Sequence, residues 1–152
     1  MKKEKTVEVL NSLVTINNDR IEGYQTASDA TEETELKNLF SQMVSTSKQC
    51  REDLATEVKL MGGKTAEGTK TTGKFFRKWM DVKAALTGKD RKAILNSCEF
   101  GEDKAKDTYD NVLDNDVKHL SPEQKSMVNA QRSLLKVDRE HIDTLNNALK
   151  EI

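Results

Sequence analysis

Apolar residues recur with helical spacing in four long segments of the chain. The segments cover about residues 6–28, 33–61, 90–117 and 121–150. Apolar positions three or four residues apart fall on one face of an α-helix, so each segment is expected to form an amphipathic helix. No alternation typical of a β-strand stands out, and the pattern predicts an all-α protein.

The connections between these segments differ in length. The first joint and the last are only a few residues long, so the helices on either side are expected to form two antiparallel hairpins. The last joint ends in "SPEQ", where Ser121 can cap the fourth helix, Pro122 suits its first position and Gln124 can reach back to the cap.

A long crossover of about residues 62–89 separates the two hairpins. It opens with the glycine-rich "GGKTAEGTKTTGK", which breaks the second helix. It then contains a short amphipathic stretch, "KFFRKWMDVKAAL", in which Trp79 is expected to be buried as part of a lid over the core. Docking of a partner or a membrane surface by this short helix is the alternative. Two hairpins joined by one long crossover predict a ferritin-like four-helix bundle, with residues 1–152 forming a single domain.

The composition of the chain argues against nucleic-acid binding, export and membrane insertion. The 152 residues are 34% charged and 35% hydrophobic with a net charge of -1, and both signs are interspersed, so no basic face for nucleic acid is expected. The N-terminal "MKKEKTVEVLNSLV" lacks the continuous apolar run of a signal peptide, and no stretch approaches membrane-spanning length. Cys50 and Cys98 form no CxxC pair and are interpreted as buried, reduced thiols. We expect a cytoplasmic protein.

Several polar side chains fall inside the apolar stripes on a helical wheel. Asn17 lies at the centre of the first stripe, one heptad before Tyr24, and Glu102 lies at the centre of the third, one heptad before Tyr109. The second helix offers Ser47 and Cys50 near its centre and Arg51 at its edge, and the fourth offers Gln131, Asp138 and His141.

These positions invite comparison with a di-metal centre. Ferritin-like sites take a Glu from each of two helices and a Glu-x-x-His from each of the other two. Glu102 matches one lone Glu, and Asp138 with His141 matches one Glu-x-x-His with Asp in place of Glu. Asn17 lacks the charge of the other Glu, and the second helix offers neither carboxylate nor imidazole at the corresponding place. Half of the ligand set is therefore missing.

The interpretation that follows is a buried polar network in place of the metals. Two buried carboxylates need a compensating cation or proton, and Arg51 is the expected cation, bridging Glu102 and Asp138. The full expected network is Asn17, Tyr24, Arg51, Glu102, Tyr109, Gln131, Asp138 and His141. The alternative is a metalloprotein with a single iron or zinc ion, or a degenerate di-iron site, held by Glu102, Asp138 and His141.

Longer stretches of the chain resemble a bacterial family. "LNSLVTINNDRIEGY", "GKFFRKWMDVKAALTGKD", "AILNSCEFGEDKAKDTY" and "VDREHIDTL" resemble a four-helix-bundle family of unknown function in the ferritin-like superfamily, over about residues 6–149. The resemblance implies the bundle fold and a bacterial, cytoplasmic setting, and it brings no established reaction. Of the superfamily's metal ligands it carries over Glu102, His141 and, as a changed residue, Asp138.

Three hypotheses on function remain. The first is a non-enzymatic helical-bundle protein without a cofactor, which acts through its surface as a homo-oligomer or with a protein partner. The second is the metalloprotein described above. The third is a binder of a small ligand in the polar core near Tyr24 and Tyr109. Metal analysis of the purified protein separates the second hypothesis from the other two.

Overall fold

Four long α-helices account for most of the structure. The computed structural model describes residues 2–67 and 91–150. The helices are α1 (Lys2–Ala30), α2 (Thr34–Leu60), α4 (Arg91–Asn115) and α5 (Pro122–Lys150), and a short 3-10 helix, η1 (Val117–His119), precedes α5. No strand occurs in these two ranges, which confirms the all-α prediction. None of the helices described is long and apolar enough to cross a membrane.

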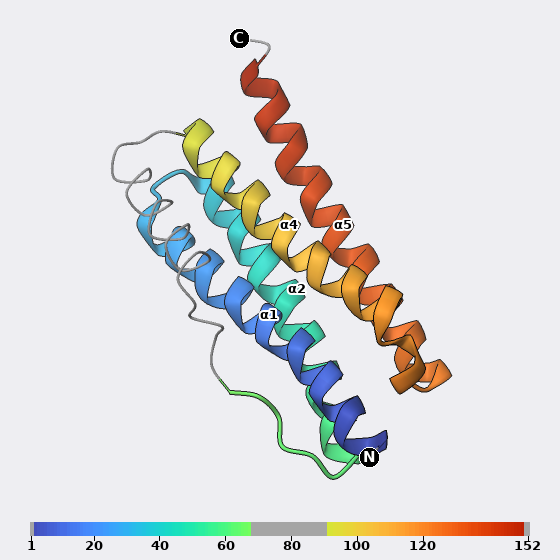
Figure 1. Ribbon diagram of the computed structural model, residues 1–152. Helices are drawn as coiled ribbons and strands as arrows, with labels where there is room; N and C mark the ends of the chain where they lie inside the picture. Colours follow the sequence, from blue (N-terminus) through green and yellow to red (C-terminus); the bar gives the residue numbers. More distant parts are fainter. Residues whose placement is uncertain (1, 68–90, 151–152) are drawn as a thin grey trace.

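Consecutive helices lie side by side in two pairs. The most extensive contacts join α1 to α2 and, next, α4 to α5, while α1 also contacts α4 and α2 contacts α5 more sparsely. Figure 1 shows the four helices packed along their length, with short connections within each pair. The short crossover helix and Trp79, which the sequence places in a lid, lie outside the described residues.

The ends of two helices follow from local chemistry. At the start of α5 the Oγ atom of Ser121 accepts a hydrogen bond from the backbone of Gln124, whose Oε1 accepts one from the backbone of Ser121. This reciprocal capping box is the one that the "SPEQ" sequence predicts. At the end of α2, Gly62 adopts a φ of 76°, and the N–H of Gly63 bonds the carbonyl of Val58. A glycine with positive φ ends helices in this way because it lacks a Cβ.

The beginning of the crossover is held against α1. Asn11 donates a hydrogen bond to the carbonyl of Lys64 at 2.9 Å and accepts one from the N–H of Ala66 at 2.8 Å. The chain therefore leaves α2 along the surface of α1.

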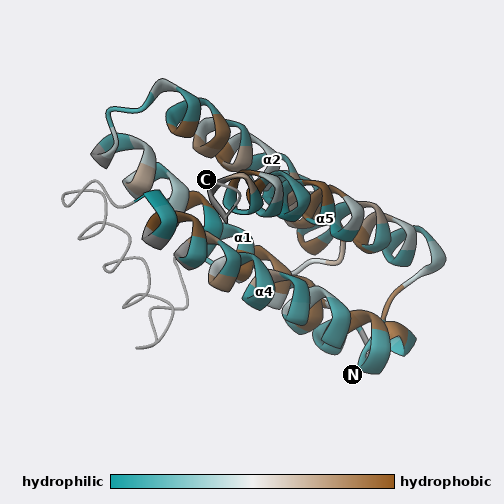
Figure 2. Cartoon of the chain, turned by 90° about the horizontal axis from the view of Figure 1, so that it is seen from above, coloured by the Kyte–Doolittle hydropathy of each residue, from teal (hydrophilic) through white to brown (hydrophobic). Residues whose placement is uncertain are grey.

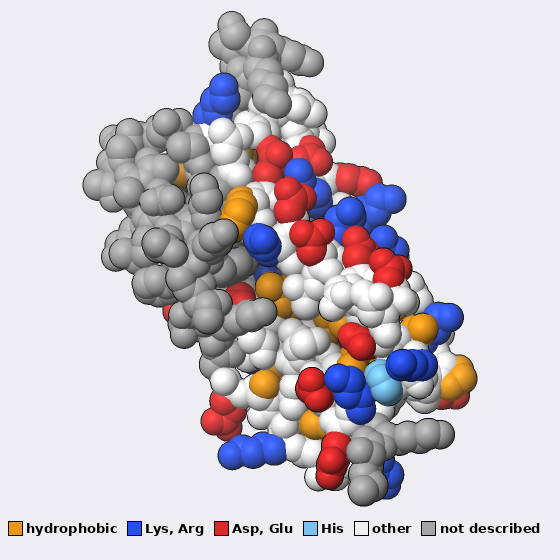
Figure 3. All heavy atoms as spheres, viewed as in Figure 1, with side chains coloured by type: hydrophobic (Ala, Val, Ile, Leu, Met, Phe, Trp, Pro, Cys, Tyr) orange, Lys and Arg blue, Asp and Glu red, His pale blue; other side chains and the backbone are white. Residues whose placement is uncertain are grey.

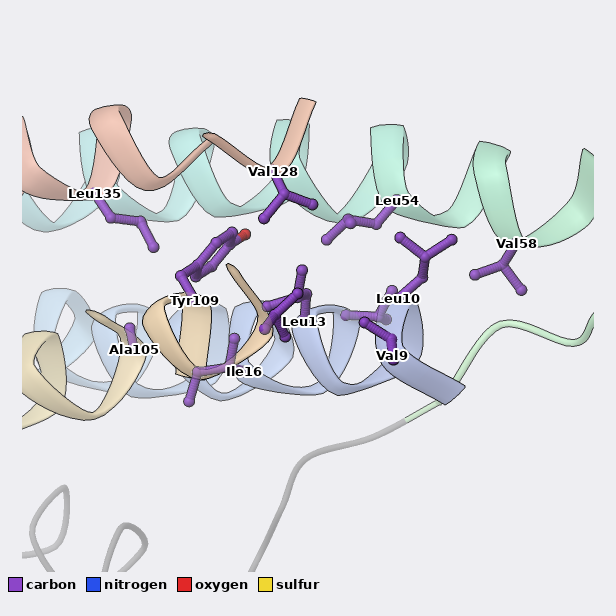
Figure 4. Packing of buried hydrophobic residues seen from close by; sticks show 12 residues of the cluster. Val9, Leu10, Leu13, Ile16, Leu54, Val58, Ala105, Tyr109, Val128 and Leu135 are labelled. Carbon is purple, nitrogen blue, oxygen red and sulfur yellow. The ribbon is translucent and has the colours of Figure 1, made fainter. Parts of the chain in front are cut away.

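The apolar core falls into two clusters along the bundle. One comprises Ile21, Tyr24, Ala27, Leu36, Phe40, Met43, Val44, Ile94, Leu95, Cys98 and Ile142. The other comprises Val9, Leu10, Leu13, Val14, Ile16, Leu54, Val58, Ala105, Tyr109, Val112, Val128 and Leu135. Apolar stretches face the neighbouring helices in Figure 2, and Figure 4 shows the second cluster, with the ring of Tyr109 among aliphatic side chains. Between the two clusters, each of the four helices contributes a buried polar residue.

A buried ion cluster as the candidate functional site

Arg20 of α1 lies at the centre of the polar layer between the two clusters. Its Nη2 atom donates to Oε1 of Glu102 on α4 at 2.7 Å and to Oδ2 of Asp138 on α5 at 3.0 Å. Its Nε atom donates to Oε1 of Glu102 at 3.2 Å, and Nη1 donates to Oγ of Ser47 on α2. One guanidinium thus joins all four helices. We call Arg20, Ser47, Glu102 and Asp138, together with Tyr24, the ion cluster.

The ion cluster is shielded from water. The side chains of Arg20 and Glu102 are each 1% exposed, and that of Asp138 is 4% exposed. Burial alone would lower the pKa of Arg20, but the charges of Glu102 and Asp138 outweigh it, so the pKa lies above its ordinary value. Arg20 is therefore a permanent cation in the core. A guanidinium suits this place because its fixed fork of donors can bond two carboxylates at once.

Two carboxylates face this one cation. Burial raises the pKa of Asp138 above its ordinary value, against the opposing effect of Arg20, and the charge of Glu102 adds to the rise. The hydroxyl of Tyr24 donates to Oε1 of Glu102 at 2.5 Å. Burial and the charge of Glu102 raise the pKa of Tyr24 well above its ordinary value, so the phenol stays protonated and serves as a donor.

A second hydrogen-bonded chain adjoins the ion cluster. Tyr109 donates to Oε1 of Gln131 at 2.7 Å and accepts a bond from Nδ2 of Asn17 at 2.9 Å. Gln131 in turn donates to the backbone carbonyl of Cys50 at 3.2 Å. This chain, which we call the tyrosine relay, ties α1, α2, α4 and α5 together a second time. Burial raises the pKa of Tyr109, so its hydroxyl remains a donor.

The expected role of Arg51 is wrong. Its side chain is only partly buried and donates to Oδ1 of Asn18 at the long distance of 3.5 Å, away from Glu102 and Asp138. The edge of an apolar stripe faces the boundary between neighbouring helices, where a long side chain can turn outward to water. Arg20 fills the bridging position instead.

The expectation that His141 faces the core, which rests on its spacing from Asp138, is also wrong. It is exposed on α5, although Asp138, one turn earlier, is buried. Three residues correspond to 300° of rotation on a helix, so the two side chains differ by 60° in direction. That difference carries His141 out of the core.

A metal pair does not fit the residues that are present. Glu102 and Asp138 both turn toward the guanidinium of Arg20, which occupies the position between them. Among the residues that the structure describes, no three His, Cys, Asp or Glu side chains come together as a group that could hold a metal ion. The ligand set of Glu102, Asp138 and His141 is therefore not assembled.

The spacing of Arg20 in the sequence indicates that it faces the core. Asn17, Arg20 and Tyr24 are spaced by three and four residues, which places all three on one helical face. Arginine is seldom buried, so a helical wheel on which residues are sorted by polarity places Arg20 on the solvent side. The reliable clue is its position beside Asn17 and Tyr24 in the stripe.

Neither thiol adds a reactive group to this core. Burial raises the pKa of Cys50 to about 11, and burial raises that of Cys98 further. Both cysteines are buried, and neither forms a disulfide bond. A protonated thiol is a poor nucleophile, so these cysteines serve as packing residues.

The fold and the two hydrogen-bonded chains define an all-α bundle protein with a charged core. Residues 5–115 match the family model described as Domain of unknown function (DUF2383). The chain belongs to this family, and the match runs from α1 to the end of α4. A comparison with curated proteins found no match. The expectation of a family of unknown function is confirmed.

Proposed function

We propose that this chain is a ferritin-like bundle in which an arginine has taken over the charge-neutralising role of a metal pair. The protein is non-enzymatic and acts through its surface. The observation that carries the proposal is the position of Arg20, whose Nη2 atom donates to both Glu102 and Asp138.

The chemistry of the guanidinium supports this proposal. A di-metal centre neutralises several inward-facing carboxylates, and its ions can change oxidation state or bind oxygen. Arginine neutralises carboxylates through fixed hydrogen bonds, but it has no open coordination position and keeps its proton throughout the accessible pH range. Arg20 thus supplies charge balance without the reactivity of a metal.

The connectivity supports the ferritin-like assignment. Two helical pairs are separated by residues 61–90, a crossover far longer than the connection within either pair. One long crossover between two helical hairpins is typical of ferritin-like bundles. In this proposal the setting is the bacterial cytoplasm, and the surface contacts a second copy of the chain or another protein.

Metal analysis of the purified full-length protein tests the proposal. The protein is incubated with Fe(II), Mn(II) or Zn(II), desalted and assayed for bound metal, and oxygen uptake is followed during the Fe(II) incubation. We expect bound metal far below one ion per chain and oxidation of Fe(II) no faster than in buffer. Near-stoichiometric metal that is lost in the Glu102→Gln variant contradicts the proposal.

A further inference from the structure

A groove runs between α4 and α5 on the outer side of the ion cluster. Its volume is about 570 Å³, within the range of small-molecule sites. Charged side chains of both signs line it, among them Lys106, Arg132, Lys136, Arg139 and Glu140. Figure 3 shows acidic and basic side chains intermingled over α4 and α5.

Glu102 also lines this groove, although it is only 2% exposed. The hydrogen bonds from Arg20 and Tyr24 all end on its Oε1 atom. Its Oε2 atom receives no hydrogen bond from any residue in the described ranges. A carboxylate can accept hydrogen bonds on both of its oxygens. Glu102 therefore presents an unused acceptor to the groove.

The balance of charge around this acceptor is negative. The lining residues and the described side chains ion-paired with them include six carboxylates, of Glu99, Glu102, Asp103, Asp110, Glu140 and Asp143. They include five cations, of Arg20, Lys106, Arg132, Lys136 and Arg139. An excess of negative charge in a partly enclosed groove favours a cationic occupant.

Both arginines of the groove wall are already engaged in ion pairs. Arg139 pairs with Glu99, Asp103 and Asp143, and Arg132 pairs with Asp110. These pairs leave the oxygen of Glu102 as the acceptor at the inner side of the groove. One open carboxylate oxygen suits a hydrogen-bond donor better than a divalent ion, which needs several oxygen ligands.

We propose that the α4–α5 groove binds a small molecule that carries a protonated primary amine, whose ammonium group donates a hydrogen bond to Oε2 of Glu102. The carbon chain of the ligand packs along Leu135 and the aliphatic stems of Lys106 and Lys136, which line the same groove. The proposal rests on the ion cluster described above, because Arg20 and Tyr24 occupy Oε1 of Glu102 and leave Oε2 to the ligand.

Titration of ¹⁵N-labelled full-length protein with n-butylammonium chloride, followed by NMR, tests this site. We expect saturable shifts of backbone amides along the facing parts of α4 and α5. Two ligands serve as matched controls: 1-butanol has the same chain without charge, and butyltrimethylammonium chloride has the charge without an N–H donor. Both should bind at least about tenfold more weakly, the effect of losing a charged hydrogen bond.

Variants locate the contact. Glu102→Gln should weaken butylammonium binding by about tenfold or more, whereas Glu140→Gln, at an exposed carboxylate of the same groove, should change it less than about threefold. Ser133→Trp leaves the ion cluster intact and should block the groove, so it tests the site even if Glu102→Gln fails to fold. Equal binding of 1-butanol, shifts that do not saturate, or unchanged binding to Ser133→Trp overturns the proposal.

A metal control separates this proposal from the proposed function. A divalent ion that displaces butylammonium and is lost in Glu102→Gln overturns both. Absence of amine binding in a protein that also takes up no metal overturns the groove proposal alone.

Discussion

Replacement of Arg20 by leucine should destabilise the protein strongly. The change removes three hydrogen bonds to carboxylates, of 2.7, 3.0 and 3.2 Å, and one to Ser47. It leaves the carboxylates of Glu102 and Asp138 in a core where their side chains are 1% and 4% exposed. Removal of one partner from a buried ion pair costs about 3–5 kcal/mol.

The size of this effect makes it measurable by urea or thermal unfolding, followed by circular dichroism. For a chain of this size each kcal/mol shifts the midpoint temperature by about 2–4 °C, so Arg20→Leu should lower it by roughly 6–20 °C. Addition of Glu102→Gln to Arg20→Leu should recover part of the loss, because one stranded charge disappears.

Arg51→Leu is the matched control, since it removes a second arginine of the same bundle. Arg51 is partly exposed and makes one long hydrogen bond to Asn18, so its loss should change stability by no more than about 0.5 kcal/mol. If Arg20→Leu unfolds like the parent protein, or Arg51→Leu is as damaging as Arg20→Leu, the account of the ion cluster is refuted.

Three further changes test neighbouring parts of the core. Tyr109→Phe should cost about 1–3 kcal/mol in urea unfolding, because Gln131 loses its buried donor; a neutral result would show that the tyrosine relay is not a stabilising feature. The raised pKa of Asp138 makes the folded state bind a proton more tightly than the unfolded state, so this residue's contribution to stability falls as pH rises from its unfolded pKa, about 4, through its raised folded pKa. Asp138→Asn should flatten the decline across that window, and an unchanged pH profile would contradict the assignment. Cys50 and Cys98 should resist a thiol reagent at pH 8 until the protein unfolds, because burial raises the pKa of both thiols; rapid labelling of the folded protein would contradict their burial.

Much of the fold was predictable because the helical signals are local. Apolar periodicity identified four helices, and the Ser121–Gln124 pair identified the start of α5. The glycine after Met61 predicts the end of α2 for the same reason: a residue without a Cβ tolerates a positive φ, and Gly62 adopts one of 76°. Such features depend only on residues close together in the sequence, so they can be predicted from a single sequence.

The candidate site was less predictable because it depends on contacts between helices. Inward positions of Glu102 and Asp138 follow from their place in apolar stripes, and both are buried. The identity of the cation that pairs with these carboxylates depends on the rotation of one helix against another and on the length of the side chain. A helical wheel of a single helix carries no information on either. A helical wheel therefore favours Arg51, which lies at the edge of an apolar stripe, although Arg20 makes the contacts. His141 shows the same limit, since an i, i+3 spacing places two residues near each other but does not bury both.

The most direct test of the central claim is the side-chain NMR signal of Arg20 in the metal-free, full-length protein. If Arg20 holds the charges of Glu102 and Asp138, its Nε–H proton should exchange slowly with water and give a resolved resonance that disappears in Arg20→Lys and persists in Arg51→Lys. Rapid exchange of every arginine Nε–H proton, with a slowly exchanging signal appearing only after a metal ion is added, would contradict the claim.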